Sequence, residues 1–74
     1  MLLAVPVERD EHDAAAWAAV EEATELLHEE RFHDALEVLR EVLKKDPQNG
    51  YAFFFLGQAL YEVGEMEAAR RLQG

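Results

Sequence analysis

The sequence predicts an all-α protein, and three observations lead to this prediction. Apolar residues recur three and four residues apart along most of the chain, as on the buried stripe of an amphipathic helix. The run Asp46-Pro47-Gln48-Asn49-Gly50 interrupts this pattern, because proline cannot stay inside a continuing helix. None of the 74 residues is a cysteine, so neither disulfides nor thiolate metal sites stabilise so short a chain.

The composition indicates one small acidic domain. Sixteen acidic residues against seven Lys and Arg give a net charge of -9, which disfavours binding to nucleic acid and to anionic membranes. The apolar start, Leu2 to Val5, meets Pro6 too early to form the core of a secretory signal, and every apolar run is far shorter than the ~20 residues of a membrane helix. We therefore expect a soluble, cytoplasmic protein with no nucleic-acid or membrane partner.

The order of elements is expected to be an N-terminal arm and four helices. Residues 1–12 are assigned to the arm, because Pro6 biases the residue before it away from helix. Asp10 or Asp13 can cap the first helix, and Gly64 can end the third in the left-handed conformation common after a helix. The four helices are expected to end near residues 29, 45, 63 and 73.

Each helix has an expected inner face. Phe32, Leu36 and Leu39 belong to that of the second helix, while His33 and Glu37 face water. The complete inner faces are Ala15, Ala19, Ala23 and Leu26 in the first helix, Phe32, Ala35, Leu36, Leu39, Val42 and Leu43 in the second, and Phe53, Leu56 and Leu60 in the third.

The helices repeat with a period of 34 residues. A shift of 34 brings Ala35 onto Ala69, Phe32 onto Met66, Leu26 onto Leu60, Glu30 onto Gly64 and Ala23 onto Gly57. This spacing, together with Leu56-Gly57 and Asp46-Pro47, resembles the tetratricopeptide repeat family.

The resemblance implies antiparallel helix-turn-helix repeats that form a fragment of a right-handed α-solenoid. Residues 13–74 then form the domain, with one repeat at 16–49 and an incomplete repeat at 50–74. Small side chains at Ala35, Gly57 and Ala69 are expected at close helix crossings. The chain departs from the family pattern at Ala19, where an aromatic residue is usual, and at Glu22, where leucine is preferred.

In this family the first helix of each repeat lines a concave groove. The resemblance places the groove at Trp17, Val20, Thr24, Leu27, His28, Tyr51, Phe54, Phe55, Gln58, Tyr61 and Glu62. Large apolar residues in a groove form a patch of the kind that marks a partner surface. The alternative is that these rings pack against the N-terminal arm or against each other.

The groove positions also indicate the chemistry of a ligand. Family members that grip acidic chaperone tails carry Lys and Asn where this chain has Val20, Thr24 and Phe55. The flanking carboxylates of Glu21, Glu25 and Glu62 repel an acidic peptide as well. We therefore expect a protein-interaction module or scaffold whose ligand is an apolar extended segment or amphipathic helix with a neutral or basic flank.

Two other functions compete with this interpretation. The aromatic face and the short last helix could instead be completed by a second copy, which gives a structural homodimer. Glu25-x-x-His28 and Glu30-x-x-His33 have the spacing of di-iron bundles, but they lie too close in sequence to sit on facing helices. With no nucleophile or phosphate-loop motif, we expect no catalytic residues, metal or cofactor.

Overall fold

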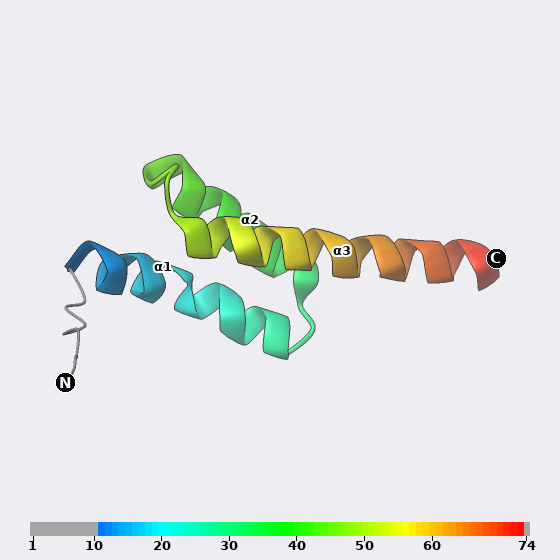
Figure 1. Cartoon of the computed structure of the whole chain (residues 1–74). Coiled ribbons are helices and arrows are strands. Elements are labelled where there is room, and N and C mark those ends of the chain that lie inside the picture. The colour runs from blue at the N-terminus through cyan, green and yellow to red at the C-terminus, as the bar shows by residue number, and fades with distance from the viewer. Residues whose placement is uncertain (1–10, 74) are drawn as a thin grey trace, which may run out of the picture.

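The computed structural model describes residues 11–73, which contain three helices, α1 (Glu11–His28), α2 (Phe32–Lys45) and α3 (Gly50–Gln73). α1 and α2 run antiparallel, and α3 packs against both before it continues past them (Figure 1). The described residues are therefore all-α, as predicted. Asp10 and the expected N-terminal arm, apart from its last two residues, lie outside the described residues.

The turn between α1 and α2 is closed by backbone hydrogen bonds. The Arg31 N–H donates to Leu26 O at 2.8 Å and the Glu30 N–H to Leu27 O at 3.0 Å, which is the Schellman arrangement of a helix end. Glu30 has a φ of 62°, the left-handed conformation usually given to glycine. Arg31 then bonds the Asp34 carboxylate, and this hydrogen bond and charge raise the pKa of the guanidinium above its usual value.

The core lies where the three helices meet. Leu39 and Val20 are its largest completely buried apolar side chains. The predicted inner face of α2 is confirmed, because Ala35, Leu36 and Leu39 are buried and its other members are partly buried. Alanines account for much of this core, and their small side chains let the helix backbones approach closely. The buried apolar residues are Val20, Ala23, Ala35, Leu36, Leu39, Ala52 and Ala59.

The inner face of α1 is rotated from the predicted one. Ala23 is buried as expected, but Ala15 and Ala19 are exposed. Val20 is buried in their place, with Leu27 packed against the core. The physical reason is apolar area, since a stripe that contains Val20 and Leu27 buries more of it than a stripe of alanines.

The predicted break at Gly64 is wrong, because α3 is a single helix of 24 residues. Gly64 does not have a positive φ, and no turn separates residues 65–73 from the helix before them. These residues are nearly all good helix formers such as Glu, Ala, Arg, Met and Leu, so local propensity favours continuation. The second half of α3 consequently extends beyond α1 and α2 (Figure 1).

Continuation of α3 leaves its expected inner face open. Phe53 is 56% exposed and Leu60 is exposed as well, whereas Leu56 is partly buried as predicted. Gly57 and Ala69 are exposed rather than at a close crossing, because no fourth helix folds back onto α3. The side of α3 that does reach the core carries Ala52 and Ala59 in full burial, with Tyr51, Phe55, Leu56 and Val63 packed around them.

We expect Gly64→Ala to stabilise the protein by about 0.5–1 kcal/mol, because alanine is the better helix former and a Cβ at this position meets nothing within 4 Å. Urea unfolding followed by circular dichroism measures the change. Gly57→Ala is the matched variant, since it too lies inside α3 in open space. A loss of stability in Gly64→Ala would instead indicate a left-handed turn at residue 64.

Candidate interaction surface

An aromatic surface joins α1 to α3, and we define it as Trp17, Tyr51, Phe54, Phe55 and Tyr61. The Trp17 ring lies 5.2 Å from that of Tyr51 and 6.1 Å from that of Phe55, between ring centroids. Phe54 and Phe55 pack edge to face at 5.2 Å. Tyr61 follows Phe54 by seven residues, two helical turns along the same side of α3. The structure thus brings together four of the predicted groove residues in one chain of ring contacts.

The exposure of these rings differs in a systematic way. Tyr51 and Phe55 are partly buried and pack against the core, whereas Trp17 is 42% exposed. Phe54 is 68% exposed and Tyr61 is 64% exposed. The aromatic surface is therefore anchored from below by two rings and opens to solvent through the other three.

Two hydrogen bonds position the surface. The Tyr51 hydroxyl donates to the Asp13 carboxylate at 2.8 Å, which fixes the first turn of α3 against the start of α1. Asn49 is buried just before α3, where its side-chain oxygen accepts the Ala52 N–H at 3.1 Å and so caps the helix. Its amide nitrogen donates to the Ala16 carbonyl at 3.0 Å.

The cap was partly visible in the sequence, and its long-range bond was not. Asn49 follows Pro47 directly before a helical pattern, which signals a helix start. Nothing in that signal names Ala16, which lies 33 residues earlier in the chain. Asp13 was considered only as a cap for the first helix, and its bond to Tyr51 went unpredicted.

The remaining predicted groove residues do not join the exposed rings. Val20 is completely buried, so it belongs to the core and cannot present a groove surface. Thr24 is partly buried and donates its hydroxyl to the Glu21 carbonyl at 2.7 Å. Leu27 packs against the core, while Gln58 is exposed on α3. Their role in binding stays a prediction.

Other chemistry finds little support within residues 13–72. His28 and His33 are exposed, and in this part of the chain no group of three His, Asp or Glu side chains is placed to hold a metal ion. Among the described helices none is both long and apolar enough to cross a bilayer.

A comparison with protein families decides the assignment. The model of the tetratricopeptide repeat matches residues 26–72, more than half of the chain. The chain belongs to the tetratricopeptide repeat family. Tetratricopeptide repeats generally act as non-enzymatic protein-interaction modules. The comparisons with curated proteins and with solved structures give no significant match.

The family match leaves the repeat boundaries as predictions. It begins at residue 26, inside the repeat expected at 16–49, and continues through the part expected to be an incomplete repeat. α1 and α2 supply the antiparallel helix pair of one repeat, and α3 begins the next. The turn that the repeat pattern expects near residue 64 is replaced by helix.

We expect Asn49→Ala to destabilise the tetratricopeptide fold by about 1–3 kcal/mol, because it removes the cap of α3 and leaves the buried Ala52 N–H without its partner. Thermal unfolding by circular dichroism gives the shift. Gln48→Ala, at the exposed neighbouring position, is the control and should change little. Equal effects of the two substitutions would mean that the Asn49 bonds contribute nothing beyond the turn itself.

Proposed function

We propose that this tetratricopeptide protein is an interaction module or scaffold that binds an apolar peptide or amphipathic helix on its aromatic surface. The observation that carries the proposal is the exposure of Phe54 and Tyr61 beside rings that are anchored in the core. Large rings exposed next to one another are typical of surfaces that a partner covers. The family supports a protein partner in general.

The charge of the chain suggests what flanks the apolar segment. Glu21 and Glu25 are exposed on α1, and Glu62 is partly buried on α3 beside Tyr61. With a net charge of -9, the chain favours a ligand whose flanks are neutral or basic. We further propose a cytoplasmic location, because a chain without cysteine gains nothing from an oxidising compartment.

Trp17 provides a reporter for this proposal, since it is the only tryptophan and touches both anchoring rings. A neutral apolar helical peptide should shift its fluorescence to shorter wavelength as the ring loses water. Phe54→Ser combined with Tyr61→Ser should abolish binding and keep the helical circular dichroism, because both side chains are mostly exposed.

Phe53→Ser is the matched control for this experiment. Phe53 is exposed like Phe54, but it lies about 100° away around α3 and outside the aromatic surface. Peptide binding should survive this substitution. Binding that is lost with Phe53 and kept without Phe54 and Tyr61 would contradict the proposed surface.

The alternative function is a structural homodimer, and the open side of α3 favours it. Phe53, Leu60 and Leu72 are all exposed, with Leu72 at 89%. They lie along a helix whose second half packs on neither α1 nor α2 (Figure 1). A two-fold pair of α3 helices would bury this apolar surface without open-ended stacking.

Sedimentation equilibrium tests the dimer. If the alternative holds, the mass should be that of a dimer at ~100 µM, well above the micromolar dissociation constants of standard interfaces. Added salt should strengthen association, because it screens the repulsion between two chains of charge -9. Phe53→Ser with Leu60→Ser should give a monomer. A wild-type monomer at this concentration would rule the homodimer out.

A further inference from the structure

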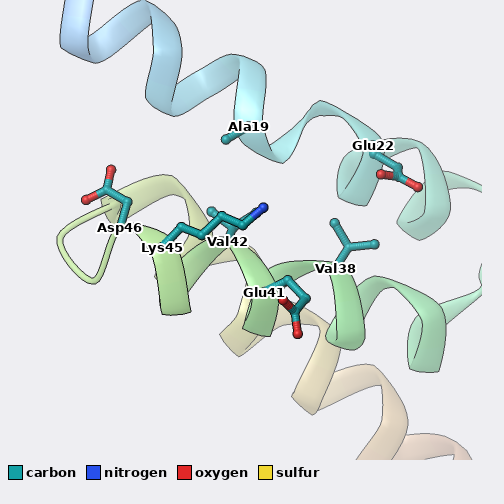
Figure 2. A pocket seen from close by; sticks show the side chains of 7 residues that line it. All are labelled: Ala19, Glu22, Val38, Glu41, Val42, Lys45 and Asp46. Atoms are coloured by element: carbon teal, nitrogen blue, oxygen red, sulfur yellow. The ribbon is translucent and has the colours of Figure 1, made fainter.

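A second groove lies between α1 and α2, separate from the aromatic surface. Its volume is about 440 Å³, within the range of protein ligand sites. No residue of α3 or of the aromatic surface lines it. The lining residues are Ala19 and Glu22 from α1, Val38, Glu41, Val42 and Lys45 from α2, and Asp46 from the turn that follows (Figure 2).

The floor of this α1–α2 groove is apolar and helical in its spacing. Val38 and Val42 are four residues apart on α2, and both are only partly buried. Ala19 faces them from α1, and its short side chain leaves the space between the two helices open (Figure 2). From Val38 to Lys45 the groove follows about 10 Å of helix axis, which suits two turns of another helix laid along it.

The rim of the groove is acidic. Glu22 borders it from α1, Glu41 from α2 and Asp46 from the end of α2, against a single cation at Lys45. Part of this charge is compensated at the surface, because Glu41 lies 3.5 Å from Lys44. Three carboxylates around an apolar floor still select positive charge on whatever enters.

The charge also selects between the occupants of the groove. A second copy of this chain would bring another net charge of -9 toward three carboxylates. A helix that carries Lys or Arg on both sides of an apolar stripe would meet attraction instead of repulsion. The occupant that fits is therefore a basic amphipathic helix of a different protein.

We propose that the α1–α2 groove docks two turns of a basic amphipathic helix. Its apolar stripe lies on Ala19, Val38 and Val42, and its Lys or Arg side chains face Glu22 and Glu41. This surface goes beyond the proposed function, because it is formed by other residues on other sides of α1 and α2. The protein then holds two partners at once, one on the aromatic surface and one in the groove.

The first experiment uses two synthetic helices and the full chain. Both peptides carry Leu at positions i, i+4 and i+7, and their flanking residues are Lys in one and Glu in the other. Fluorescence anisotropy should show binding of the Lys peptide that weakens as salt is added, with the Glu peptide at least tenfold weaker. Equal binding of the two peptides would overturn the proposal.

Charge reversal on the rim locates the contact. Glu22→Lys with Glu41→Lys should weaken the Lys peptide at least tenfold and strengthen the Glu peptide. The matched control, Glu37→Lys with Glu67→Lys, changes the net charge equally at exposed positions outside the groove and should cost much less. Equal losses in both variants would mean that only the overall charge attracts the peptide, which overturns the groove assignment.

Two further variants separate this proposal from the aromatic surface and from self-association. Ala19→Phe should fill the groove and lower affinity for the Lys peptide at least tenfold, while Phe54→Ser with Tyr61→Ser should leave that affinity unchanged. Loss of Lys-peptide binding in the aromatic variant alone would move the contact to that surface. A sedimentation mass that falls on Ala19→Phe would show a second copy in the groove. Either result would refute the basic-helix proposal, and neither bears on whether neutral peptides bind the aromatic surface.

Discussion

The arrangement of the three helices depends on the buried amide of Asn49. Its oxygen satisfies the first turn of α3, and its nitrogen reaches a carbonyl in the middle of α1. One side chain thus fixes both where α3 begins and how that end lies against α1. A buried amide is costly unless both of its ends are bonded, so this geometry is well determined. Tyr51 follows two residues later, and its bond to Asp13 secures the same junction.

The choice of small side chains in the core determines what remains outside. Ala23, Ala35, Ala52 and Ala59 are completely buried, and they draw the helices close enough that little space remains for rings between them. The aromatic residues of α3 therefore pack around the edge of the core instead of inside it. This distribution leaves Phe54 and Tyr61 in contact with water although they are among the largest apolar side chains of the chain.

Sequence reasoning succeeded where one helix has one strong apolar stripe. On α2, Leu36 and Leu39 alternate with charged residues at a clear helical period, so its inner face and its ends were predictable. On α1, alanines occur on several sides, and the competing stripes could be separated only by what packs against them. Val20 was accordingly assigned to a groove when it belongs to the core.

The end of the chain shows a different limit of prediction. Gly64 allows a turn, but a turn forms only if the helix that follows gains enough contacts to offset the lost helical hydrogen bonds. The match of residue types to the period of 34 gives no measure of that balance. Glu30, at the equivalent position of the first pair, makes the turn although glycine would suit its conformation better. Tertiary contact therefore outweighs the local preference at both positions.

The uncovered half of α3 has a consequence for how the molecule opens. Residues 64–72 are exposed on all sides, so their backbone hydrogen bonds are held only by the helix itself. Helical segments of this length are marginal in water without packing. Their amide hydrogens should exchange with solvent through local fraying, whereas those around Leu39 and Ala59 exchange only when the three-helix core opens. The protein therefore comprises two cooperative units of unequal stability within one continuous helix, and a partner that binds the outer half would raise its protection without touching the core.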